Sequence, residues 1–159
     1  MAIIFLMPIR DDVVIGQGVV IPQPELVNLF GCAIGDNSMI GPFVEIQAGV
    51  VIGKRCRIQS HTSVCEGVVL EDDVFVGHGV MFTNDRYPKA SNADGSRVGP
   101  NDWVLETIRV GFRSTIGSGS VILPGVTIGS NVMVGAGSVV TKSLPDNCTV
   151  IGNPAREIS

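Results

Sequence analysis

The stretch 34–58 reads IGDNSMIGPFVEIQAGVVIGKRCRI, and every sixth residue in it is isoleucine. The same step continues through other apolar residues, stops after Phe82 and resumes at Val110. The full series is Ile34, Ile40, Ile46, Ile52, Ile58, Val64, Leu70, Val76, Phe82, Val110, Ile116, Ile122, Ile128, Val134 and Val140. A small or β-branched residue follows most of them after four positions, as at Ser38 and Val44. Such a long fixed period indicates a repetitive architecture.

A six-residue period fits neither an α-helix nor a coiled-coil heptad. It is three times the two-residue period of a β-strand, so short extended segments separated by turns satisfy it. Three hexads then close one triangular coil, and successive coils stack roughly 4.8 Å apart, the spacing of paired strands. The large apolar residues fill the coil, small residues fit near its corners, and glycine or asparagine supplies the unusual corner angles.

The pattern is weaker upstream of Ile34. Ile15, Ile21 and Val27 keep the six-residue step, but seven residues separate Val27 from Ile34. We therefore expect one inserted residue near Phe30 and Gly31.

Composition narrows the class of protein. The 159 residues suffice for one domain, and the formal charge of −4 with scattered basic residues argues against a nucleic-acid binder. No run approaches the roughly 20 apolar residues of a membrane span. The start, MAIIFLMPIR, is apolar but lacks the basic region and cleavage site of a signal peptide. The four cysteines show no CxxC pair, so we expect reduced thiols in a cytoplasmic protein.

The hexads over about residues 13–155 resemble those of the hexapeptide-repeat acyltransferases. The resemblance implies an all-β fold, a left-handed parallel β-helix. Its handedness comes from the resemblance alone, because the general rule for parallel crossovers favours the right-handed form. We expect a single domain over 1–159, with one long loop at 83–107 and a short C-terminal tail at 146–159.

The coil predicts which polar residues stack, because residues one coil apart share an edge of the prism. His61 and His78, the only histidines, fall in hexads one coil apart and are predicted on one edge. Glu66 and Asn84 are eighteen residues apart and are predicted to stack on the next edge. Corner residues face solvent, so ordinary surface residues remain the alternative for all four.

The interruption at 83–107 is longer than the roughly 12 to 15 residues beyond which structureless loops are uncommon. It contains the only tyrosine and the only tryptophan, Tyr87 and Trp103. Aromatic and arginine side chains suit stacking on a ring and binding a phosphate. We therefore interpret the loop as a cover for a ligand, with a tolerated insertion as the alternative.

A narrower resemblance lies in CEGVVLEDDVFVGHGVMFTNDRYPKA, residues 65–90. It is similar to N-acetyltransferases acting on nucleotide-linked 3-amino sugars, whose products feed bacterial surface polysaccharides. The family motif, Asn-Asp after a Gly-His-Gly coil and then an aromatic-Pro, matches Asn84, Asp85, Tyr87 and Pro88. The resemblance implies a cytoplasmic, acetyl-CoA-dependent homotrimer with active sites between subunits. It also implies that Asn84 contacts the amino sugar near the reacting nitrogen.

We assign the remaining substrate contacts to Glu66, Asp85, Arg86 and Tyr87. The C-terminal segments 135–142, GAGSVVTK, and 152–156, GNPAR, resemble the coenzyme A region of the superfamily. Small corner residues admit the pantetheine arm, and basic residues suit its phosphates. The predicted cofactor-binding residues are Gly117, Ser118, Gly135, Ala136, Thr141, Lys142 and Arg156.

Two mechanisms stay open. His61 or His78 acts as a general base toward the acceptor amine, or Asn84 and backbone N–H groups chiefly align the reactants. We favour alignment by Asn84 with a histidine assisting. The acceptor sugar, its nucleotide and the acyl group are left open.

Other classes of hexad protein remain as alternatives. A metal-dependent carbonic anhydrase of the γ type needs three imidazoles, and this chain has two histidines, so no metal site is predicted. Another hexapeptide acyltransferase, for serine, maltose or an antibiotic, shares the hexads. A non-catalytic subunit of a larger β-helix assembly is the remaining alternative.

Overall fold

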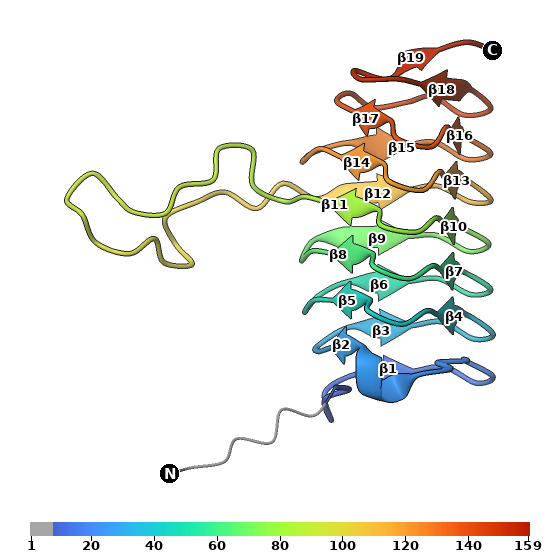
Figure 1. Ribbon diagram of the computed structural model, residues 1–159, viewed down its shortest axis with the longest axis horizontal. Helices are drawn as coiled ribbons and strands as arrows, with labels where there is room; N and C mark the ends of the chain where they lie inside the picture. Colours follow the sequence, from blue (N-terminus) through green and yellow to red (C-terminus); the bar gives the residue numbers. More distant parts are fainter. Residues whose placement is uncertain (1–7) are drawn as a thin grey trace.

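Short extended segments alternate with turns throughout the computed structural model, which describes residues 8–159. They stack into one column of coils, with the first described residues and the C-terminus at opposite ends of the column (Figure 1). The absence of a signal-peptide pattern was predicted from a segment that lies mostly outside the described residues. Within 8–159 no helix is long and apolar enough to cross a membrane.

The strands form three sheets, one on each face of the prism. Sheet 1 contains β1 (Val14–Ile15), β3 (Ala33–Ile34), β6 (Val51–Ile52), β9 (Val68–Leu70), β12 (Ile108–Val110) and β15 (Thr127–Ile128). Sheet 2 contains β4 (Met39–Ile40), β7 (Arg57–Ile58), β10 (Phe75–Val76), β13 (Thr115–Ile116), β16 (Met133–Val134), β18 (Thr149–Ile151) and β19 (Arg156–Glu157). Sheet 3 contains β2 (Asn28–Leu29), β5 (Glu45–Ile46), β8 (Ser63–Val64), β11 (Met81–Phe82), β14 (Val121–Ile122) and β17 (Val139–Val140).

The pairing is parallel and follows the predicted coil. Ile40 pairs with Ile58, eighteen residues later, and Ile58 pairs in turn with Val76. Among the strands of residues 8–159, β19 alone runs antiparallel, against β18 at the end of the column. Every residue of the six-step series is buried, with no side chain more than 2% exposed. The prediction of a left-handed parallel β-helix is confirmed.

Small residues near the corners bond one coil to the next. The buried Ser38 hydroxyl donates to Gly53 O at 2.9 Å and accepts the Cys56 N–H at 3.0 Å. Ser114 makes the same pair of bonds with Gly129 O and the Val132 N–H. A serine at this position therefore provides a hydrogen bond to one backbone carbonyl and one backbone N–H of the next coil. A larger side chain would not fit between these groups.

Gly77 shows how closely the coils approach at a corner. A Cβ added there would lie 2.5 Å from the backbone nitrogen of Ser118 in the next coil. That distance is inside van der Waals contact, so only glycine permits the observed stacking.

The first coil departs from the prediction. Leu29, not Val27, takes the inward strand position, because it pairs with Ile46. The segment before Leu29 is longer than the six-residue step because it contains a 3₁₀ turn, η1 (Pro24–Leu26). The step from Leu29 to Ile34 is one residue shorter than six. The single insertion expected near Phe30 is therefore wrong: the extra length lies in the turn.

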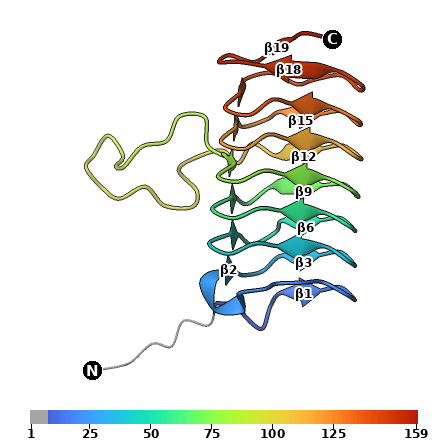
Figure 2. The ribbon, with the colours of Figure 1, turned by 45° about the vertical axis from the view of Figure 1, so that its right-hand side comes forward.

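The long loop leaves the column without disturbing it. Val110 of β12 pairs with Leu70, forty positions earlier instead of eighteen, so the coil resumes where it stopped. Residues 83–107 lie between β11 and β12 and project from one edge (Figures 1 and 2).

The four cysteines are free thiols. Three are buried, and Cys65 is partly exposed. Burial raises the pKa of the Cys56 thiol to about 11. A thiol that stays protonated is a poor nucleophile, so Cys56 serves as a core residue.

Candidate functional site

The edge between sheets 2 and 3 carries both histidines, and we call it the histidine edge. Ser60, His78 and Ser118 occupy the same hexad position in successive coils and form one column. The Ser60 hydroxyl lies 2.9 Å from His78 Nδ1, and the backbone N–H of His78 donates to Ser118 Oγ at 3.1 Å. Ser60 thus orients the His78 ring, and no hydrogen bond to its Nε2 is made within residues 8–159.

His61 sits one hexad position later than His78, one coil below it. Its backbone is in the left-handed region, with φ 63°, and its ring lies 4.8 Å from the Phe43 ring. The structure therefore places both histidines on one edge but in different surroundings. His78 is held by a hydroxyl, and His61 packs on an aromatic ring.

The edge between sheets 3 and 1 is the loop edge. Here Glu66, Asn84, Pro124 and Lys142 follow the paired strands at the same position. Asn84 Nδ2 donates to the Glu66 carbonyl oxygen at 3.2 Å, so the predicted stacking of this pair occurs through the backbone of Glu66. Because Nδ2 makes this bond, and Oδ1 has no hydrogen-bond partner among the residues that the structure describes, Oδ1 can accept from a ligand N–H.

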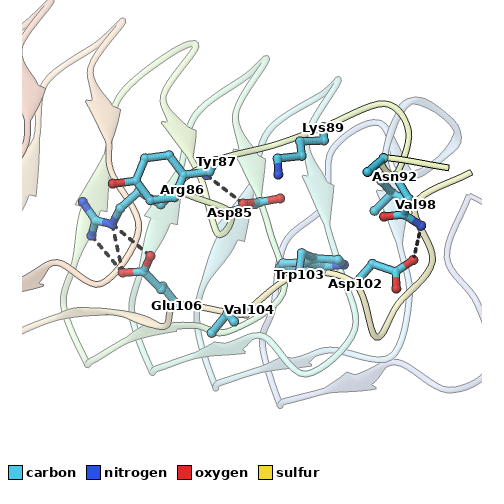
Figure 3. Close-up of a pocket in the computed structure, with 11 residues that line it drawn as sticks. Asp85, Arg86, Tyr87, Lys89, Asn92, Val98, Asp102, Trp103, Val104 and Glu106 are labelled. Carbon is cyan, nitrogen blue, oxygen red and sulfur yellow. Dashed lines mark hydrogen bonds and ion pairs between the residues drawn. The ribbon is translucent and has the colours of Figure 1, made fainter. Parts of the chain in front are cut away.

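The loop encloses a hollow of about 270 Å³. Figure 3 shows Arg86 and Glu106 at one end, Asn92 and Asp102 at the other, and Lys89 with Trp103 between them. Tyr87 also lines the hollow and is 78% exposed. The Asp85 carboxylate accepts the Tyr87 N–H at 2.9 Å, which shapes the start of the loop.

Arg86 is engaged within the protein. Its guanidinium donates to both carboxylate oxygens of Glu106, at 2.9 and 2.8 Å, and to Pro124 O at 2.6 Å. The hydrogen bond from Arg86 lowers the pKa of the Glu106 carboxyl, so the pair stays ionised at neutral pH. Glu106 lies in the loop, which has no repeat. Pro124 takes the hexad position of Asn84 in the next coil, but nothing in the sequence indicates that either residue bonds to Arg86.

The predicted cofactor residues lie on two edges. Gly117, Ser118, Gly135 and Ala136 follow β13 and β16 on the histidine edge. Thr141 and Lys142 follow β17 on the loop edge, and Arg156 lies in β19. A Cβ added at Gly119 or Gly137 meets no atom within 4 Å, so the histidine edge is open where an extended arm would lie.

On the third edge, between sheets 1 and 2, the charged side chains are paired with one another. Lys54 pairs with Asp36 at 3.1 Å, and Arg55 pairs with Asp73 at 2.7 Å. The Gln17 N–H and Lys54 hold the pKa of Asp36 below its usual range. Because these charges already have partners, we place the candidate site on the other two edges.

No group of three histidine, cysteine or acidic residues is close enough to bind a metal ion anywhere in 8–159.

Two models of known protein families match this chain. The bacterial transferase hexapeptide model (six repeats) matches residues 31–65 and 107–142, and the hexapeptide repeat of succinyl-transferase matches 49–83. Together these matches cover more than half of the chain. The chain belongs to the bacterial hexapeptide-repeat transferases.

Individual members of this hexapeptide family are similar over most of the chain. The bifunctional protein GlmU of Synechococcus sp. (strain RCC307) is 28% identical over 89% of this chain and 31% of its own length. The chain thus spans about a third of that relative.

Two solved structures share the coil. The hexapeptide-repeat acetyltransferase VCA0836 of Vibrio cholerae, complexed with acetyl coenzyme A, is 28% identical with a TM-score of 0.67, covering 86% of this chain and 73% of that one. A variant of AntD, an N-acyltransferase from Bacillus cereus in complex with dTDP and coenzyme A, is 26% identical with a TM-score of 0.68, covering 94% and 81%.

Proposed function

We propose that this chain is an acetyl-CoA-dependent N-acetyltransferase that acts on the amino group of a nucleotide-linked amino sugar. The main support for the proposal is the interruption of the coil after β11, where the long loop begins next to Asn84. Family membership supports acyl transfer, and the ligands named for VCA0836 and AntD support a CoA thioester and a nucleotide-bearing acceptor. A 3-amino sugar destined for surface polysaccharide is the acceptor that the Asn84-Asp85 motif favours.

The division of the cofactor residues supports a site between subunits. Ala136 lies on the histidine edge and Lys142 on the loop edge, and sheet 3 separates these edges within one chain. A single coenzyme that contacts both residues therefore needs the histidine edge of one subunit beside the loop edge of another. The same packing brings His78 of one subunit toward Asn84 of its neighbour.

In the proposed reaction the acceptor nitrogen attacks the thioester carbonyl, the carbon–sulfur bond breaks, and an amide and a thiol form. Asn84 Oδ1 accepts an N–H of the amine and directs its lone pair at the carbonyl carbon. His78, oriented by Ser60, is placed to take a proton from the amine, and the departing sulfur finally receives one. The roles of Asp85 and Tyr87 remain predictions from the motif. The role of Glu66 remains a prediction from its stacking with Asn84, and that of Arg156 from the resemblance of the C-terminal segment to a coenzyme A region.

The test is release of CoA thiol, followed with a chromogenic disulfide, over a panel of nucleotide-linked amino sugars with acetyl-CoA. We expect thiol only with an acceptor amine, together with the matching amide by mass spectrometry. The same nucleotide sugar with a hydroxyl in place of the amine is the control. Equal turnover of serine, or of the hydroxyl analogue, would assign the chain to another branch of the family.

Replacing Ala136 with tyrosine is expected to raise the KM for acetyl-CoA about tenfold, equivalent to losing about 1.4 kcal/mol of binding. Ala136 is exposed on the open histidine edge, so a large side chain obstructs the proposed path of the pantetheine arm. Ser130→Tyr, at the equivalent hexad position on the third edge, serves as the matched control. A normal KM in Ala136→Tyr would place the coenzyme elsewhere.

The chain is expected to form a homotrimer in solution. Each sheet has an outward apolar residue that one subunit leaves exposed: Val51 at 45%, Met81 at 41% and Met133 at 47%. A three-sided prism packs around a threefold axis so that each groove joins two different edges. Multi-angle light scattering at micromolar concentration should give three times the chain mass, and a stable monomer at that concentration contradicts the expectation.

A further inference from the structure

Three contacts at the base of the loop form a unit, the Arg86 clamp, which consists of Arg86, Glu106 and the Pro124 carbonyl. The bidentate pair of Arg86 with Glu106 joins the two stems of the loop. The bond from Arg86 Nη2 to Pro124 O, at 2.6 Å, joins those stems to the coil above. Planar guanidinium groups suit this geometry, because their fixed donors match a carboxylate and still reach a third acceptor.

Two glycine corners of the coil leave room for the side chains at the base of the loop. Gly125 has φ +77°, and a Cβ added there would lie 2.7 Å from Glu106 Oε2 and 3.3 Å from Arg86 Nη2. Below the loop, a Cβ on Gly67 would lie 3.1 Å from the Leu105 side chain. The loop stems are therefore held between two glycine corners, one in the coil below and one in the coil above.

The clamp also holds Asn84. The Glu106 N–H donates to the Asn84 carbonyl oxygen at 3.1 Å, while the Asn84 side chain bonds to Glu66 O. Glu106 thus bonds Arg86 with its side chain and Asn84 with its backbone. A shift of either stem moves the Asn84 amide relative to the column.

We propose that Arg86 is a positioning residue, which holds the loop base and the Asn84 amide in register for catalysis rather than binding the acceptor itself. This inference rests on the proposed function for its kinetic part. Its structural part, the coupling of the loop to the coil, does not depend on any substrate. From the sequence we predict Arg86 as a substrate contact, and its contacts in the structure favour the positioning role instead.

The clamp is not expected to matter for global stability. The side chains of Arg86 and Glu106 are 39% and 31% exposed, and exposed ion pairs contribute little to folding. Removing the guanidinium should therefore leave the coil folded. Any loss of turnover then reports on geometry and not on unfolding.

The experiment compares Arg86→Gln with Arg97→Gln, which removes the same charge from the exposed far part of the same loop. We expect Arg86→Gln to lower kcat at least tenfold, because small displacements of aligning groups can cost up to about 10²-fold. The KM values for acceptor and acetyl-CoA should stay within about twofold, the pattern of an interaction needed only in the transition state. Arg97→Gln should match the wild type.

A second readout needs no substrate. Trp103, the only tryptophan, lines the hollow of the loop, so acrylamide quenching of its emission reports how firmly the loop is held. We expect quenching to increase in Arg86→Gln and to stay unchanged in Arg97→Gln. The charge exchange Arg86→Glu with Glu106→Arg should restore part of both signals, since the ion pair reforms without the Pro124 bond.

The outcomes separate the two proposals. A raised acceptor KM at normal kcat overturns the positioning role and makes Arg86 a substrate ligand. Unchanged kinetics and unchanged quenching also overturn it. If the wild type turns over no amino sugar while Arg86→Gln alone increases quenching, the coupling of the loop stands and the proposed function falls.

Discussion

The Asn84→Ala variant is expected to fold normally and to lose about 10²-fold in kcat, the scale of a misaligned reacting group. The alanine removes the amide group. In the wild type its Nδ2 donates to Glu66 O, and its Oδ1 has no hydrogen-bond partner within residues 8–159. The acceptor KM should change less, because we assign most of the binding energy to the nucleotide. Steady-state kinetics with thiol detection gives both values, and thermal unfolding checks the fold.

The two histidines supply the internal comparison. His78→Asn removes a ring held by Ser60, and His61→Asn removes one that packs on Phe43. If alignment dominates, each histidine variant should lose less in kcat than Asn84→Ala. A severe loss in His78→Asn with near-normal kcat in Asn84→Ala would instead establish general-base catalysis and remove Asn84 from its assigned role.

The Phe82→Ala variant is expected to lose about 3–5 kcal/mol of unfolding free energy, the usual cost of deleting a buried phenyl ring. Phe82 is 1% exposed and pairs with Val64 below and Ile122 above, at the level where the loop departs. The coils cannot close over the vacated space, because their spacing is set by the backbone ladder.

Guanidinium unfolding at a fixed protein concentration measures this effect. Phe112→Ala is the matched control, since Phe112 is 38% exposed on a corner and should cost under about 1 kcal/mol. Equal midpoints for Phe82→Ala and the wild type would mean that the inner column does not determine stability. Phe82 and Asn84 lie two residues apart, so the pair of variants separates stability from activity.

The local period determined most of what could be predicted about the site. His61 and His78 were placed on one edge because a solenoid pairs each residue with the one a coil away. The column of Ser60 under His78 follows from the same count, and sequence reasoning passed over it. The first coil was mispredicted because Val27 and Leu29 are both apolar and both buried, at 6% and 0% exposed, and only pairing distinguishes them.

The sequence by itself determined the β-helix, its core and the place where the coil opens. Those features depend on contacts at a constant separation along the chain, so a period of six reveals them. Tertiary structure alone decided that Arg86 bonds Glu106 and Pro124, and that the loop stems lie between Gly67 and Gly125. These contacts join the loop, which has no repeat, to corners of the coils above and below it. The six-residue spacing therefore does not predict which loop residue contacts which corner.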